Sequence, residues 1–200
     1  MPDSVPATSA VTTPATAQDP AQAESVRGAP GPAPAPDPLT GLPGREALLA
    51  WTDQAIAAAR RRKDMLALLA FDLDEFIQVN ERFGAAGGDR LLVEIVHRAQ
   101  SVLRDSDALG RVGGDDFLVA VARIGSLEQA EAVARRVVAR LGEPFLLDGQ
   151  WMSPSVSLGV AVYPDHGLTA AVLAAKADAA LARAKRGGKG RAAFAAGGLA

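Results

Sequence analysis

The sequence predicts one α+β domain, in which helices cover an antiparallel or mixed sheet, behind a leader rich in proline and alanine. Nine of the thirteen prolines lie at or before Pro38, and no aromatic residue precedes Trp51. Such a segment cannot bury enough apolar surface to offset its chain entropy, so residues 1–36 are expected to be disordered. Short apolar runs of strand length then alternate with amphipathic stretches of helical period. We therefore expect the domain to cover residues 37–194, with a tail at 195–200.

The elements are expected in the order β-α-α-β-β-α-β-β-α after a first helix, an order typical of α+β domains. The apolar run LALLAF predicts a buried strand, and the Gly-Gly pair at 113–114 predicts a hairpin between two strands. The glycine-rich segment 84–88 is expected to separate two helices. The expected helices are 46–62, 75–83, 89–103, 127–141 and 169–185, and the expected strands are 66–71, 109–112, 117–121, 144–147 and 155–162.

Composition narrows the function classes. A formal net charge of −2 gives no general reason to expect nucleic-acid binding, and the absence of cysteine excludes disulfides and thiolate chemistry. The start Met1-Pro2-Asp3 does not resemble a secretion signal. No segment approaches the roughly 18 consecutive apolar residues of a membrane span. We expect a cytoplasmic protein that recognises phosphate only locally.

Two pairs of carboxylates are the first candidates for chemistry. Asp72 and Asp74 end the apolar strand, and Asp115 and Asp116 lie at the expected hairpin tip. If the two elements are neighbours in one sheet, their carboxylates converge, and such oxygen ligands suit a Mg²⁺ ion bound to a nucleotide. Each pair alone also fits a structural role, as a strand end with helix-capping carboxylates or as an ordinary tight turn.

The motifs taken together resemble those of the GGDEF, or diguanylate cyclase, family. The signature loop of that family resembles RVGGDDF at 111–117. Further family motifs follow the expected order: DPLTGLPGR at 37–45, FDLDEF at 71–76, Asn80, FGAAGGD at 83–89, SVSLGVAVYP at 155–164 and ADAALARAK at 177–185. The resemblance covers almost the whole chain after Asp37. It implies a palm-like fold, ferredoxin-like and related to nucleotide cyclases.

The resemblance also implies a reaction, in which two GTP molecules condense to cyclic di-GMP and pyrophosphate. Each subunit of a homodimer would bind one GTP. Asp72, the Leu73 carbonyl and Asp115 match the ligands of Mg²⁺ or Mn²⁺. Asp115 also matches the proton acceptor for the attacking 3′-hydroxyl, and Asp116 accompanies it in the catalytic loop.

The same resemblance assigns substrate contacts. Asn80 and Asp89 match residues that read the guanine edge, which suits an amide and a carboxylate. Gly113 and Gly114 would allow the ligand to approach the backbone closely. Lys185 and Lys189 match a basic pair that contacts the terminal phosphates. Without the resemblance, these lysines would be read as a solvated basic helix end.

A second site is expected on the resemblance to the inhibitory R-x-x-D motif. Arg104 and Asp107 fit this motif, because Arg104 lies nine residues before Gly113. There an arginine would bind cyclic di-GMP by charge-assisted hydrogen bonds. Arg136 is the expected third contact, with Arg135 as the alternative.

Several positions depart from the family pattern. Ile77 stands where a transition-state lysine is usual, and loss of such a donor costs about 10²–10³ in rate in other enzymes. Asp116 replaces the usual glutamate, and Lys189 replaces an arginine without its bidentate fork. Ala85 and Ala182 replace a frequent histidine and a frequent tyrosine. The sequence therefore predicts either a diguanylate cyclase, which could be slow, or a degenerate domain that binds cyclic di-GMP or GTP as a receptor.

Overall fold

The computed structural model describes residues 35–197, so most of the leader expected at 1–36 lies outside the described residues, as does the end of the tail. The described chain runs through four helices and seven strands: α1 (Arg45–Arg62), β1 (Met65–Asp74), α2 (Phe76–Val102), β2 (Ala108–Gly113), β3 (Asp116–Ile124), α3 (Leu127–Leu141), β4 (Phe145–Leu147), β5 (Gln150–Met152), β6 (Ser155–Tyr163), α4 (Ala170–Arg186) and β7 (Ala192–Phe194).

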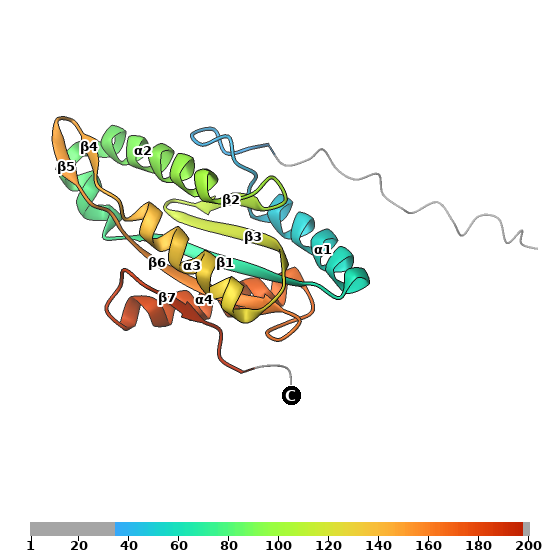
Figure 1. Ribbon diagram of the computed structural model, residues 1–200. Helices are drawn as coiled ribbons and strands as arrows, with labels where there is room; N and C mark the ends of the chain where they lie inside the picture. The colour runs from blue at the N-terminus through green and yellow to red at the C-terminus, as the bar shows by residue number, and fades with distance from the viewer. Residues whose placement is uncertain (1–34, 198–200) are drawn as a thin grey trace, which may run out of the picture. The chain divides into compact units, whose positions relative to one another are not determined.

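The main sheet has five strands in the order β2-β3-β1-β6-β7 (Figure 1). Neighbours are antiparallel except β6 and β7, which run parallel, so the sheet is mixed as expected. β1 lies at the centre, where Asp72 is opposite Asp116 of β3 and Ser157 of β6. This register brings the C-terminal end of β1 and the N-terminal end of β3 to the same end of the sheet.

Two apolar clusters fill the two faces of the sheet. One packs α2 and α3 on alternate residues of β1 that include Leu69 and Phe71. The other packs α1 and α4 on the intervening residues, which include Leu66 and Leu68. Strand periodicity places these two sets on opposite faces, so the sheet lies between two helical layers, in an α+β fold of the palm-like type. None of the helices between residues 35 and 197 is long and apolar enough to span a bilayer.

Gly159 of β6 allows α4 to approach the sheet closely. A Cβ at this position would lie 2.0 Å from the Ala177 carbonyl oxygen and 2.3 Å from the Leu181 nitrogen. Both contacts are backbone atoms of α4, so no side-chain rotation could relieve them. The close contact holds the middle of α4 against the sheet, one helical turn before Lys185.

The structure corrects three expectations. The break expected at 84–88 is confined to Gly84 (φ 71°, ψ 171°), and α2 resumes at once. β5 was not expected, although its turn Asp148-Gly149 is a strong hairpin signal; it pairs with β4 in a separate two-stranded sheet. The third difference is β7, three residues long, which the sequence pattern alone could not distinguish from a loop.

A buried histidine closes the turn between β6 and α4. The His166 Nδ1 accepts a hydrogen bond from the Val162 amide (2.9 Å), and the His166 amide donates to the Val162 carbonyl (2.7 Å). Burial lowers the pKa of His166, and Lys176 lowers it further against the opposing effect of Asp165. An acceptor at Nδ1 likewise requires the neutral imidazole.

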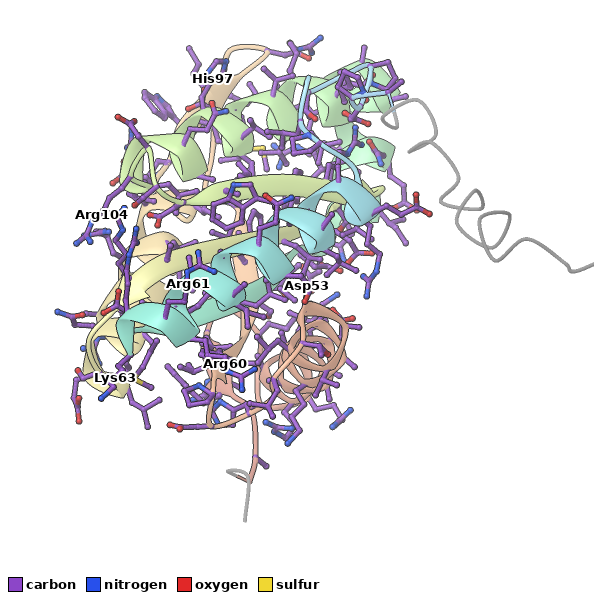
Figure 2. The ribbon with its side chains drawn as sticks, turned by 90° about the vertical axis from the view of Figure 1, so that its right-hand side faces the viewer. Asp53, Arg60, Arg61, Lys63, His97 and Arg104 are labelled. Carbon is purple, nitrogen blue, oxygen red and sulfur yellow. The ribbon has the colours of Figure 1, made fainter. Side chains whose placement is uncertain are left out.

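His166→Ala should lower the free energy of unfolding by about 1–3 kcal/mol near neutral pH, because the Val162 amide loses its buried acceptor. Since the folded pKa lies below the unfolded one, the unfolded chain binds the proton first as pH falls below about 6.5. The stabilisation by His166 is therefore complete above that pH and shrinks below it. Urea unfolding at about pH 7.5 and about pH 5.5 measures this change. A pH-independent difference would contradict the assignment; His97→Ala, on the exposed side of α2 (Figure 2), is the matched control.

Candidate active site

Three carboxylates converge at the end of the sheet where β1 finishes and β3 begins. Asp72 is buried, with 8% of its surface exposed, and lies directly across from Asp116. Asp115 precedes Asp116 in the hairpin between β2 and β3. Burial raises the pKa of Asp116 to about 6, and the charges of Asp72 and Asp115 add to this effect. Burial and then Asp72 also raise the pKa of Asp115, so negative charge is concentrated here.

Lys185 compensates part of this charge. Its Nζ, at the C-terminal end of α4, donates to the Asp72 Oδ2 in an ion pair. Asp72, a predicted metal ligand, and Lys185, a predicted phosphate contact, thus lie in direct contact. Within the described residues no three His, Asp or Glu side chains form a metal-binding group by themselves. The local donors, carboxylate oxygens whose mutual repulsion a cation would relieve, nevertheless have the chemistry that suits a hard divalent ion.

The hairpin is held by Arg111, which the sequence analysis did not single out. Its Nε and Nη2 donate to the Gly114 carbonyl (2.9 and 2.7 Å), and its Nη1 donates to the Asp37 Oδ1 (2.9 Å). Burial alone would raise the pKa of Asp37, but hydrogen bonds from Thr40 and Arg111 outweigh it and lower that pKa. Asp37 and Arg111 are each the first residue of a motif, which could have drawn attention to them. No spacing rule connects residues 74 positions apart, so their contact could not be predicted.

Asn80 and Gly88 pack together across the kink of α2. The Asn80 Oδ1 lies 1.9 Å from the position that a Cβ of Gly88 would take, so only glycine leaves room for this side chain. Asp89 follows immediately and is exposed. Asn80 thus packs against the residue that precedes Asp89, so the two residues expected to read guanine lie near each other.

A second basic residue lies one loop beyond Lys185. Lys189 donates to the Glu75 Oε1 (2.9 Å), in the connection between β1 and α2. The bond raises the pKa of Lys189. Ile77, in the first turn of α2, is 73% exposed and offers no polar group where the resemblance would place a lysine.

The R-x-x-D residues lie in the turn between α2 and β2, apart from the carboxylates. Asp107 uses both oxygens locally, because Oδ2 accepts from the Arg104 amide (2.9 Å) and Oδ1 from the Ala122 amide (3.1 Å). Arg104 itself is exposed and points away from the body of the domain (Figure 2). Arg136 donates to the Val102 carbonyl (2.9 Å), close to this turn, whereas Arg135 pairs with Glu131 on its own helix.

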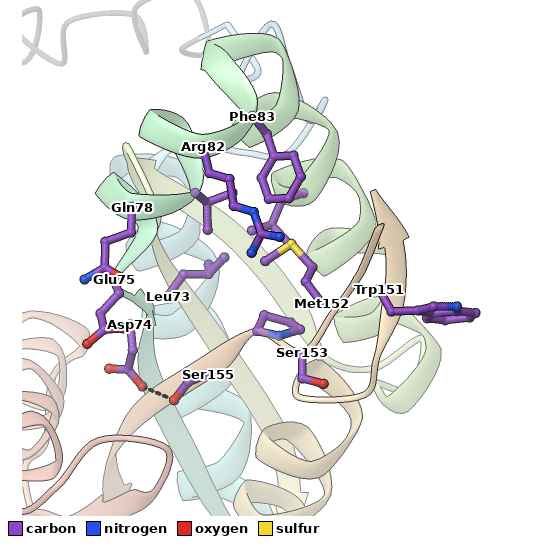
Figure 3. Close-up of a pocket in the computed structure, with 13 residues that line it drawn as sticks. Leu73, Asp74, Glu75, Gln78, Arg82, Phe83, Trp151, Met152, Ser153 and Ser155 are labelled. Atoms are coloured by element: carbon purple, nitrogen blue, oxygen red, sulfur yellow. Dashed lines mark hydrogen bonds between the residues drawn. The ribbon is translucent and has the colours of Figure 1, made fainter. Parts of the chain in front are cut away.

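A cavity of about 370 Å³ lies beside the carboxylates, between the first turns of α2 and the segment 151–155 (Figure 3). Leu73 and Asp74 are the two wall residues that the sequence also marked as candidates. Phe83, Met152 and Trp151 supply apolar surface, and Trp151 is 73% exposed. The cavity thus adjoins the site through Leu73 and Glu75, whereas its lining does not include Asp72, Asp115, Asp116 or Lys185.

Comparison with known proteins agrees with this geometry. Residues 35–191 match the family described as diguanylate cyclase, GGDEF domain. Diguanylate cyclase TpbB of Pseudomonas aeruginosa is 39% identical over 155 residues, which are 77% of this chain and 36% of TpbB. Cyclic di-GMP phosphodiesterase NbdA of the same species is 36% identical over 79% of this chain and 20% of NbdA. The chain thus spans about a third of TpbB and a fifth of NbdA.

Solved structures give the same result. The isolated GGDEF domain of TpbB, from Pseudomonas aeruginosa, superimposes with a TM-score of 0.78 at 38% identity, covering 80% of this chain and 94% of that one. A microbial GGDEF domain whose structure concerns its interaction with cyclic di-GMP has a TM-score of 0.68 at 33% identity, covering 80% and 96%. The fold, the signature hairpin and the extent of the match lead to one conclusion: this chain belongs to the GGDEF family.

Proposed function

We propose that the domain is a diguanylate cyclase, which condenses two GTP molecules into cyclic di-GMP and two pyrophosphates as a homodimer. The observation that carries the proposal is the convergence of Asp72, Asp115 and Asp116 at one end of the sheet, with Lys185 paired to Asp72. Similarity to TpbB, a named diguanylate cyclase, supports the same activity. Each domain would bind one GTP, so that two active sites must face each other.

Asp72, the Leu73 carbonyl and Asp115 would hold Mg²⁺ or Mn²⁺, which when bound neutralises phosphate charge and assists activation of the attacking hydroxyl. Asn80 and Asp89 would orient the guanine, beside the backbone of Gly88. The 3′-oxygen of one GTP attacks the α-phosphorus of the other; its proton passes to Asp115 and pyrophosphate leaves. Lys185 and Lys189, now paired with Asp72 and Glu75, would contact the terminal phosphates. Gly113 and Gly114 keep the hairpin backbone open to the ligand.

A second candidate function is a receptor for cyclic di-GMP or GTP. The exposed apolar side chain of Ile77 favours it, because a developing phosphate charge receives no donor there. Arg104 and Arg136 would bind cyclic di-GMP, with Asp107 fixing the turn through its two backbone contacts. Both functions involve cyclic di-GMP, and they differ in whether GTP is turned over.

Asp115→Ala should reduce cyclic di-GMP formation by about 10²–10⁴-fold, because it removes a metal ligand and the proton acceptor together. Chromatography of the products from GTP and Mg²⁺ measures this loss. Asp148→Ala, at the exposed tip of the other hairpin, is the matched control and should retain full activity. Turnover that survives Asp115→Ala would show that the active site is wrongly placed. A wild-type protein without product, at concentrations that force dimers, would exclude the cyclase.

Ile77→Lys should raise the rate of a slow cyclase by about 10²-fold, because an ammonium group restores a donor for transition-state charge. The position is 73% exposed, so the substitution should leave the melting temperature nearly unchanged. Ile77→Met controls for the change of shape. Single-turnover measurements give the chemical step. An unchanged rate in the lysine variant would show that Ile77 does not limit catalysis.

Arg104→Ala should weaken binding of cyclic di-GMP by about tenfold or more, the usual effect of losing a charge-assisted hydrogen bond. Calorimetry with Arg136→Ala alongside should show a similar loss. Arg135→Ala, whose guanidinium pairs with Glu131, should bind as the wild type does. Equal affinity in the Arg104→Ala and wild-type proteins would refute the second site.

A further inference from the structure

Asp74, the last residue of β1, has all its hydrogen bonds directed at neighbouring backbone and hydroxyl groups. Its Oδ1 accepts from the Ser157 hydroxyl (2.7 Å). Its Oδ2 accepts from the Ser155 hydroxyl (2.6 Å), shown in Figure 3, and from the Gly190 amide (3.0 Å). A carboxylate that accepts three such bonds is fixed in orientation. Asp74 therefore differs from Asp72 two residues earlier, whose side chain contacts Lys185.

The Gly190 amide belongs to the short loop that follows α4 and precedes β7. Gly188, Lys189 and Gly190 have φ angles of 114°, 60° and 58°, three successive residues in conformations that an extended or helical chain does not use. Beyond it, the Arg191 carbonyl accepts from the Leu158 amide (2.9 Å) and fixes the loop to β6. Asp74 supplies the corresponding attachment to β1. The loop is thus held from two neighbouring strands.

Lys189 directly precedes these two attachments in the chain. Its backbone precedes the Gly190 amide that Asp74 binds, and its side chain reaches Glu75, the residue after Asp74. Asp74 at the end of β1 and Glu75 directly after it therefore hold two consecutive residues of the loop, Gly190 and Lys189. One contact fixes the backbone, and the other holds the ammonium group of a side chain that is 46% exposed. The backbone contact is made by the Gly190 amide, so it does not depend on the ion pair between Lys189 and Glu75.

We propose that Asp74 is a positioning residue, which holds the loop 187–191 so that Lys189 is presented to the terminal phosphates of GTP. This inference rests on the proposed function in one respect, the phosphate contact of Lys189. Without this attachment, GTP binding would have to order the loop and the long lysine side chain, and the lost conformational entropy would weaken the affinity. The expected consequence is weaker GTP binding with the chemical step little changed, because Asp74 contacts neither the hairpin nor Lys185.

The test compares Asp74→Ala and Asp74→Asn with the wild type in two measurements. Asp74→Ala should raise the KM for GTP about tenfold, the usual scale of a lost hydrogen bond to a charged group, and change kcat by less than about threefold. Asp74→Asn should keep the KM close to that of the wild type, because its amide oxygen can accept from the Gly190 amide while its NH₂ donates to the Ser157 hydroxyl. Amide hydrogen exchange in residues 187–191 should be faster in Asp74→Ala than in the wild type.

The exchange measurement requires no turnover, so it separates the two proposals. If the wild type makes no cyclic di-GMP, the proposed cyclase fails, and exchange together with the affinity for a non-hydrolysable GTP analogue still decides the role of Asp74. Asp178→Ala, which removes an exposed carboxylate of α4, is the control and should change neither quantity. Should Asp74→Ala fail to fold, Ser155→Ala removes one of the three bonds at an exposed position and should accelerate exchange less. Wild-type exchange and wild-type KM in the Asp74 variants would overturn the inference.

Discussion

The burial of β1 on both faces is the constraint on which the site depends. Eight consecutive residues, Leu66 to Leu73, are buried between the two helical layers. A slip of one residue against β3 or β6 would exchange the two faces of the strand and is therefore excluded by the packing of both clusters. The same register places Asp72 opposite Asp116, so the apolar core determines where the carboxylates meet.

Cations then determine how so much negative charge is tolerated. Lys185 neutralises Asp72, Lys189 pairs with Glu75, and Arg111 binds Asp37 beside the hairpin. Two of these residues come from α4 and the loop after it, whose distance from the sheet is set by Gly159. The site thus combines two segments distant in sequence, each held by contacts outside it. Asp74 differs from these ion pairs, because its partners are two serine hydroxyls and a backbone amide rather than another charge.

Much of this arrangement could be predicted from the sequence, because the apolar pattern indicated the central strand and five helices, two of which the structure joins as α2. The motifs singled out Asp72 and Asp115 as site residues. The prediction was weakest where no local pattern exists. Three residues are too few for periodicity to reveal β7, and the bonds from Arg111 to Asp37 and from Lys185 to Asp72 join residues that no helical or strand spacing relates. The role of Ile77 remains a prediction, because an exposed side chain without a polar partner leaves its effect on catalysis open to experiment.

The Arg111 guanidinium has a mechanical consequence. One planar group holds the Gly114 carbonyl at the tip of the hairpin and the Asp37 carboxylate at the start of the domain. The Arg111 amide also donates to the Pro43 carbonyl, which closes the same segment against β2 (3.0 Å). A displacement of Asp37 would pull on Gly114 without first deforming the core. The segment at 37–45 is therefore linked, through one side chain, to the backbone next to Asp115.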